Sequence, residues 1–190
     1  MNTDHDRLCS SPEWAEYIAG EIVPWCLADL DPGKELLELG GGFGAATARL
    51  IDLAPRLTIV ERDPVLAQQL AERFPRAEFP GVEVCQADAT ATQLPAGAFD
   101  AAVCFTMLHH VSPETAQDQL FTEVARLLRP GAWFAGTDSV ASERLRDFHD
   151  GDIYQPIDVQ GLPDRLRAAG FVDVRTEVQE RIFRFRCIRA

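Results

Sequence analysis

Residues 35–44 of the chain read ELLELGGGFG, and this stretch decides the fold. The run Glu35–Leu39 is typical of a buried strand, and it leads directly into four glycines within five positions. A helical pattern over Ala45–Leu53 follows. Glycines at such a junction allow a sharp turn and a close approach of the backbone to a ligand. Because open α/β sheets bind ligands at this kind of turn, the stretch predicts both an α/β fold and its binding site.

Strand-like and helical patterns alternate along the rest of the chain. Further strands are expected over 57–61, 82–87, 99–105 and 132–137, and helices over 64–73, 113–128 and 158–169. Two strand-like runs end the chain, Phe171–Val178 and Arg181–Ile188, and the connection between them is short enough only for an antiparallel hairpin. The sequence therefore predicts a doubly wound, mostly parallel sheet with one antiparallel strand and helices on both faces.

Serine residues mark the expected starts of two helices. In the N-terminal segment, residues 1–33, Ser10 and Glu13 have the spacing of a capping box ahead of a run of apolar residues at helical spacing. Farther along the chain, Ser112 is expected to cap a helix that begins at Pro113.

The composition is that of an ordinary globular protein. Its 190 residues, 46% of them apolar, are enough for a single domain over residues 1–190. The net charge of −12 disfavours a nucleic-acid or anionic-membrane partner. Five scattered cysteines and a polar N-terminus indicate reduced thiols and a cytoplasmic location. No group of histidines, cysteines and aspartates has the spacing of a zinc site, so no metal is expected.

The glycine turn fits two classes of ligand. Gly40, Gly42 and Gly44 suit one class, while Gly40, Gly42 and Ala45 also satisfy the dinucleotide pattern G-x-G-x-x-[GA]. Glu61 lies at the end of the second expected strand, where its carboxylate can accept hydrogen bonds from ribose hydroxyls. Both classes of ligand contain a ribose, so Glu61 does not separate them.

Two further carboxylates favour S-adenosylmethionine over a dinucleotide. Glu38 lies two residues before the glycines, where it would oppose a pyrophosphate but stabilise the ammonium and sulfonium of S-adenosylmethionine. Asp88 follows the third strand and can accept from the adenine amine, while the Ala89 backbone N–H can reach a ring nitrogen. An aspartate there is also common as a loop cap. Loop capping is a weaker explanation for the three carboxylates Glu38, Glu61 and Asp88 together, because they lie at three successive strand ends.

The chain resembles class I S-adenosylmethionine-dependent methyltransferases, of the small stand-alone type that acts on small molecules. The resemblance extends from residue 34 to near the C-terminus. It rests on residues 38–44, Glu61, Asp88, the segment Phe99–Val111, the turn Leu127–Gly131 and the last helix with Gly170-Phe171.

The resemblance implies a Rossmann-like sheet with the order 3-2-1-4-5-7-6 and further cofactor contacts. Gly40, Gly41, Gly42 and Gly44 would form the cofactor loop. Arg62 would lie beside the adenine, and Phe105 would line the methionine or adenine pocket. Two positions depart from the pattern of the family. Many members have a cysteine or another small residue where this chain has Gly41, and they often have an aspartate where it has Glu61.

Methyl transfer is an in-line displacement at an activated methyl group, so the protein mainly positions the reactants and excludes water. A general base is needed only when the nucleophile must lose a proton early. The candidates are His109, His110, Asp138 and His149. His110 is better explained by packing and Asp138 by a cap, and the resemblance brings His109 nearer the acceptor. His109 and His149 are therefore the predicted catalytic residues.

Two segments remain to shape an acceptor pocket, residues 1–33 and the connection 139–157. In the connection, Arg144, Arg146 and His149 could bind an acidic acceptor, although an exposed helix face is the better explanation for Arg146. In the N-terminal segment, Trp14 and Tyr17 could close over the cofactor, although their helical spacing favours core packing.

Three functions remain open at this stage. The first is methylation of an unidentified small molecule with S-adenosylmethionine as the donor and no metal. The second is a catalytically silent domain of the same fold that binds the cofactor. The third is an NAD-dependent oxidoreductase, which Glu38 and the lack of a second catalytic domain disfavour. The sequence identifies neither the acceptor nor the oligomeric state.

Overall fold

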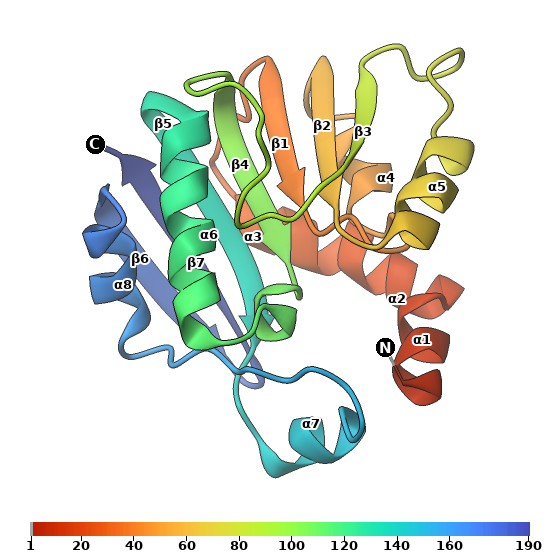
Figure 1. Cartoon of the computed structure of the whole chain (residues 1–190), viewed down its shortest axis with the longest axis vertical. Helices are drawn as coiled ribbons and strands as arrows, with labels where there is room; N and C mark the ends of the chain where they lie inside the picture. The colour runs from red at the N-terminus through yellow and green to blue at the C-terminus, as the bar shows by residue number, and fades with distance from the viewer. Residues whose placement is uncertain (1) are drawn as a thin grey trace.

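A seven-stranded sheet forms the centre of the computed structural model, which describes residues 2–190 (Figure 1). Its order is β3-β2-β1-β4-β5-β7-β6. β1 to β5 are parallel, whereas β7 runs antiparallel to both of its neighbours, β5 and β6. The strands are β1 (Glu35–Leu39), β2 (Arg56–Glu61), β3 (Val82–Gln86), β4 (Phe99–Phe105), β5 (Leu128–Ser139), β6 (Phe171–Gln179) and β7 (Ile182–Arg189). The predicted fold class, strand order and terminal hairpin are confirmed.

Helices cover both faces of this sheet. They are α1 (Thr3–Cys9), α2 (Pro12–Tyr17), the π-turn η1 (Ile18–Ile22), α3 (Val23–Leu27), α4 (Thr47–Leu50), α5 (Pro64–Arg73), the 3₁₀ turn η2 (Leu108–His110), α6 (Glu114–Leu127), α7 (Glu143–Phe148) and α8 (Leu162–Ala168). Within residues 2–190, none of these helices is both long and apolar enough to cross a membrane. All five cysteines are free thiols, as the sequence indicated.

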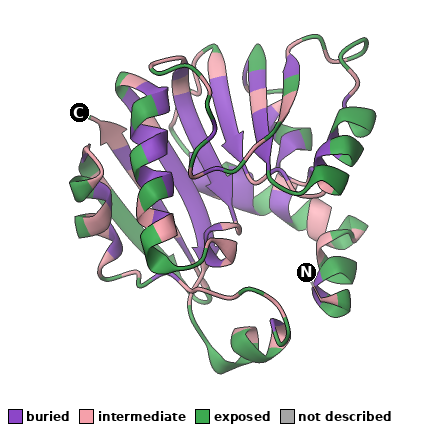
Figure 2. Ribbon diagram, in the orientation of Figure 1, coloured by how far each residue is buried: buried purple, intermediate pink, exposed green. Residues whose placement is uncertain are grey.

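Two hydrophobic clusters lie on opposite faces of the sheet, because successive strand side chains point in opposite directions. Leu36 of β1 packs in the cluster that α3, α4 and α5 cover. Leu37 packs in the other cluster, beneath α6 and α8. The central strands are accordingly buried on both sides (Figure 2). This double burial explains why their sequences are continuous apolar runs.

The structure corrects two of the predicted helix caps. Ser11, not Ser10, caps the second helix, and its hydroxyl accepts a hydrogen bond from the Trp14 N–H at 3.2 Å. At the start of α6, Pro113 occupies the capping position and Ser112 lies outside it, so Ser112 is not the cap. In both helices the preceding turn shifts the start by one residue, which sequence spacing alone does not resolve.

Some element boundaries also differ from the predictions. The expected helix over 45–53 is regular only in α4. The helix expected from Asp158 begins at Leu162, because the Asp158 carboxylate accepts from the Gln160 and Gly161 N–H groups and forms a turn instead. β5 begins at Leu128, earlier than expected, because Leu128 already pairs with Phe99.

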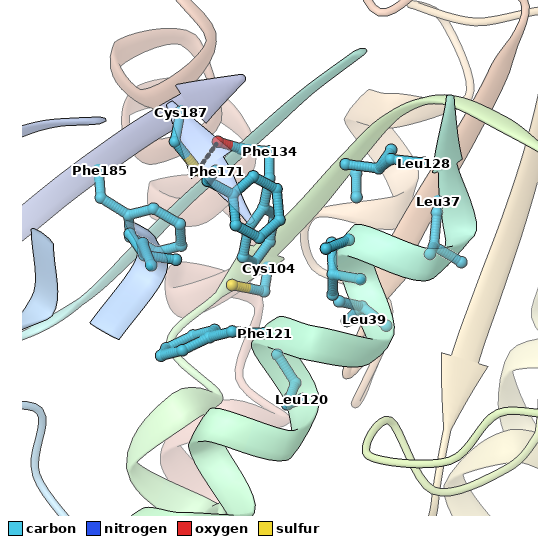
Figure 3. Close-up of a cluster of buried hydrophobic side chains, with 14 of the residues drawn as sticks. Leu37, Leu39, Cys104, Leu120, Phe121, Leu128, Phe134, Phe171, Phe185 and Cys187 are labelled. Atoms are coloured by element: carbon cyan, nitrogen blue, oxygen red, sulfur yellow. Dashed lines mark hydrogen bonds between the residues drawn. The ribbon is translucent and has the colours of Figure 1, made fainter. Parts of the chain in front are cut away.

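Phe134 lies at the centre of the aromatic part of the core (Figure 3). Its ring is 4.9 Å from that of Phe185 and 5.7 Å from that of Phe171, and it is fully buried. We predict that Phe134→Ala lowers the free energy of unfolding by about 3–5 kcal/mol, because it leaves a cavity that the sheet cannot close. Urea denaturation measures this loss. Val172→Ala, at an exposed position of β6, is the matched control, and a loss for Phe134→Ala no larger than the control's would contradict the prediction.

Candidate functional site

The main cavity of the structure lies at the carboxyl ends of β1, β2, β3 and β4 and has a volume of about 580 Å³. The chain leaves β1 toward α4 on one face of the sheet and leaves β4 toward α6 on the other. The carboxyl ends of these two adjacent strands therefore stay uncovered, which is where doubly wound sheets bind ligands. The cavity has the size of a small-molecule site.

The glycine turn forms the floor of this cavity. Gly40 and Gly42 have φ of +72° and +52°, values that other residues rarely adopt. A Cβ at Gly41 would lie 2.5 Å from Ile59, so the turn also packs tightly on β2. A Cβ at Gly42 would meet no described heavy atom within 4 Å, so this backbone is open to a ligand. Gly44 does not line the cavity, and a Cβ at this position would lie 2.9 Å from the Phe74 ring.

Glu38 is a buried carboxylate in the wall of the cavity. It is 1% exposed, and the Thr47 hydroxyl donates to it at 2.7 Å. Burial is the main reason that its pKa rises to about 8, with a further contribution from the nearby Glu61, while the Thr47 hydrogen bond acts in the opposite direction. A ligand cation placed beside this carboxyl group would therefore lower its pKa.

Glu61 connects β2 to the glycine turn. Its two oxygens accept from the backbone N–H of Gly42 at 2.8 Å and of Asp63 at 2.9 Å. Each carboxylate oxygen has a second lone pair, so the group can still accept from ligand hydroxyls. The two backbone bonds hold Glu61 at the rim of the cavity.

Asp88 and Arg62 form the opposite wall. The Thr90 backbone N–H and hydroxyl both donate to Asp88 Oδ1, at 2.9 and 2.7 Å. Oδ2 lies 3.9 Å from the Arg62 guanidinium. Partial burial would raise the pKa of Asp88, but the Thr90 hydrogen bonds and the charge of Arg62 outweigh it and lower the pKa. Ala89 lines the cavity next to Asp88.

The N-terminal segment supplies another side of the cavity. His5, Cys9, Trp14 and Ile18 all line it, together with Phe105 at the end of β4. Trp14 therefore has the position that a lid requires. Tyr17 does not line the cavity: it packs against the Trp14 ring and is 37% exposed.

The adjacent histidines His109 and His110 point in different directions. His110 lines the cavity, whereas His109 is turned into the protein and does not line it. His109 Nδ1 lies 2.6 Å from the fully buried Asp138 carboxylate, which also accepts from the His109 and Ser139 backbone N–H groups. Burial lowers the pKa of His109, but Asp138 outweighs it and raises the pKa. Asp138 thus caps the strand end and orients His109 at once.

The four histidines of the chain meet at one end of the cavity. One ring nitrogen of each of His5, His109, His110 and His149 lies within 4.8 Å of those of the other three. His149, like His109, lies behind the wall and does not line the main cavity. His5 and the cluster as a whole were not predicted from the sequence, because the four histidines come from three segments that are distant along the chain. The one signal was numerical: the chain has only four histidines.

A family model described as a methyltransferase domain matches residues 37–136, which is more than half of the chain. The matched region contains the glycine turn and the three carboxylates Glu38, Glu61 and Asp88. The chain belongs to the class I S-adenosylmethionine-dependent methyltransferase family.

Individual methyltransferases differ in how much of this chain they match. A probable ribosomal RNA small subunit methyltransferase A of Halobacterium salinarum is 36% identical over 137 residues, which cover 66% of this chain and 48% of that protein. The chain thus spans less than half of the curated relatives that it matches.

Two solved structures share the methyltransferase fold. A SAM-dependent methyltransferase from Aquifex aeolicus superimposes with a TM-score of 0.77 at 17% identity and covers 100% of both chains. The [4+2]-cyclase SpnF superimposes with a TM-score of 0.67 at 28% identity and covers 83% of this chain and 58% of that one.

The raised pKa of Glu38 makes the stability of the folded chain depend on pH. Between pH 4.5 and about 8 the folded protein keeps a proton that the unfolded chain has lost, so stability falls as the pH rises through this window. We predict that Glu38→Gln raises the melting temperature of the ligand-free protein, and that the gain is larger at pH 8 than at pH 5.

Thermal unfolding followed by circular dichroism at the two pH values tests this prediction. Glu83→Gln, at an exposed position of β3, removes the same charge outside the cavity and is the control. A gain that is equal at both pH values, or that the control reproduces, would show that Glu38 is not the group responsible.

Proposed function

We propose that the chain binds S-adenosylmethionine in the main cavity and transfers its methyl group to a small-molecule acceptor. The observation that carries the proposal is the buried carboxylate of Glu38 next to the open backbone of Gly42. A dinucleotide would bring its pyrophosphate to this point, where the added negative charge would raise the pKa of Glu38 further instead of compensating its carboxylate. The ammonium of the methionine moiety would instead compensate the Glu38 charge.

The other groups of the cavity suit the remaining parts of this cofactor. Glu61, held by two backbone N–H groups, would accept from the ribose hydroxyls. Asp88 would accept from the adenine amine through Oδ2, because Thr90 already occupies Oδ1. Ala89 would offer its backbone N–H to the ring, and Arg62 would lie beside it. These assignments follow the direction of the glycine turn, with the methionine near β1 and the adenine near β3.

The acceptor would enter at the end of the cavity where His5, His110 and Trp14 lie. Asp152 and Ile153, from the connection 139–157, complete this end. Their position supports the proposal that the connection shapes the acceptor pocket, whereas Arg146 lies outside the main cavity.

The predicted catalytic residues His109 and His149 would act through this acceptor end. Their rings lie behind the cavity wall and contact its histidines: the His109 and His110 ring centroids are 4.1 Å apart, and those of His5 and His149 are 4.6 Å apart. We therefore expect all four imidazoles to contribute to the acceptor site, and we do not expect His109 to act alone as a general base.

A small acceptor is favoured over RNA, although the Halobacterium relative is named a ribosomal RNA methyltransferase. More than half of that relative lies outside the match, so the match does not carry over its RNA contacts. The chain also has a net charge of −12, which opposes binding to a polyanion.

A second candidate function is a domain of this fold that performs no methyl transfer. The observation in its favour is the likeness to SpnF, which is described as a [4+2]-cyclase. Release of S-adenosylhomocysteine from S-adenosylmethionine in the presence of an acceptor separates the two candidates. A screen of small acids, phenols, amines and thiols is the experiment, and we expect stoichiometric product release with members of one class.

Isothermal titration with S-adenosylhomocysteine and with NAD tests the cofactor assignment. We predict micromolar binding of S-adenosylhomocysteine and no binding of NAD. Asp88→Ala should weaken S-adenosylhomocysteine binding by about tenfold or more, because the adenine amine loses its charged acceptor. Asp52→Ala removes an exposed carboxylate outside the cavity and should leave the affinity unchanged. Heat release with NAD alone would overturn the assignment, and unchanged affinity of Asp88→Ala would remove Asp88 from the site.

A further inference from the structure

Histidines from three distant segments converge beside the acceptor end of the cavity. His5 comes from α1, His109 and His110 from η2, and His149 from the residue that follows α7. One ring nitrogen from each lies within 4.8 Å of the others, and these are all the histidines that the chain has. Because all four histidines of the chain converge on one point, a ligand that they share explains their position better than packing does.

Two of the four rings are oriented by carboxylates through Nδ1. His109 Nδ1 lies 2.6 Å from Asp138, and His5 Nδ1 lies 3.1 Å from Asp152. A carboxylate at this distance receives the Nδ1 proton and leaves the second ring nitrogen, Nε2, as the one with a free lone pair. Metal-binding histidines typically have this second contact, which sets both the tautomer and the ring direction.

The other two rings are oriented by backbone carbonyl groups, again through Nδ1. His149 Nδ1 lies 2.6 Å from the Leu145 oxygen, and His110 Nδ1 lies 3.2 Å from the Ile153 oxygen. A carbonyl only accepts, so in these rings too the proton belongs on Nδ1 and the lone pair on Nε2. Among the described residues, the buried Nε2 of His149 has no hydrogen-bond partner.

From this geometry we propose that the four histidines bind one divalent transition-metal ion through their Nε2 atoms. Imidazole nitrogen is a ligand for Zn²⁺, Cu²⁺ and Ni²⁺, whereas Mg²⁺ and Ca²⁺ require oxygen ligands. Asp138 and Asp152, behind the ligands, supply the two negative charges that balance the ion. In a tetrahedral zinc site the nitrogens lie roughly 2.0–2.1 Å from the metal, so the rings move closer together when the ion binds.

An ion at this position would join three segments of the chain that are distant in sequence. It connects α1 to η2 and to the loop after α7, and each of these segments contributes a residue to the lining of the cavity: His5, His110 and Asp152. The start of α1 already contacts the end of α7 and the loop after it through Asn2, whose side chain donates to the Phe148 and Asp150 carbonyl groups at 2.8 and 3.1 Å. The ion therefore fastens the N-terminal segment over the cavity, and the inference does not depend on which reaction the cavity performs.

Zinc titration of the full chain, prepared without a polyhistidine tag and stripped with a chelator, tests the proposal. Competition with a chromophoric zinc indicator should show one Zn²⁺ per chain. His149→Ala should weaken binding by more than about 100-fold, and Asp138→Asn by roughly 10–100-fold. Cys85→Ser changes a metal-binding side chain of β3 that lies outside both the cluster and the cavity, and this variant should bind zinc as the unaltered chain does.

Cobalt supplies a spectroscopic readout that a purely structural histidine cluster would not give. Co²⁺ bound to four nitrogens should show the visible absorption of a tetrahedral site, and the bands should vanish in His149→Ala. If circular dichroism shows that this variant is unfolded, His110→Ala, at a partly exposed position, takes its place. Failure of the folded, unaltered chain to bind one equivalent, or equal affinity in the histidine variants, would overturn the proposal. S-adenosylhomocysteine binding is measured separately, so either result stands without the other.

Discussion

The divergence of the chain after β1 and β4 is the constraint on which the rest of the structure depends. These strands are neighbours and parallel, yet their connections lead to opposite faces of the sheet. Neither connection can cover the point between them, so a crevice forms there without any special side chain. The glycine turn then lets the backbone follow the floor of this crevice closely, and the ends of β2 and β3 extend it sideways.

The charged side chains that line this crevice determine which ligands it favours. The sheet places Glu38, Glu61 and Asp88 at three successive strand ends, where all three line the cavity. Glu61 and Asp88 accept hydrogen bonds from nearby backbone groups, whereas Glu38 is buried and accepts from the Thr47 hydroxyl. A site of this kind disfavours phosphate and favours a ligand with one cationic end and one hydroxyl-rich part.

The sequence predicted what depends on local patterns. The glycine turn, the strand ends and their carboxylates lie within short stretches, so the lining of this part of the cavity could be predicted from the sequence, with the exception of Gly44. The caps at Ser10 and Ser112 were misplaced by one residue because the capping position depends on backbone angles. The histidine cluster escaped prediction because His5, His109 and His149 are brought together only when α1 and the loop after α7 fold against η2.

The central claim is that the cavity binds S-adenosylmethionine with its ammonium at Glu38 and its adenine at Asp88. The most direct measurement is a crystal structure of the full chain with S-adenosylhomocysteine. We expect the ammonium to lie within hydrogen-bond distance of Glu38 at the end of β1. The ribose hydroxyls should contact Glu61, and the adenine amine should contact Asp88. The reversed orientation, or density for the ligand outside this cavity, would contradict it.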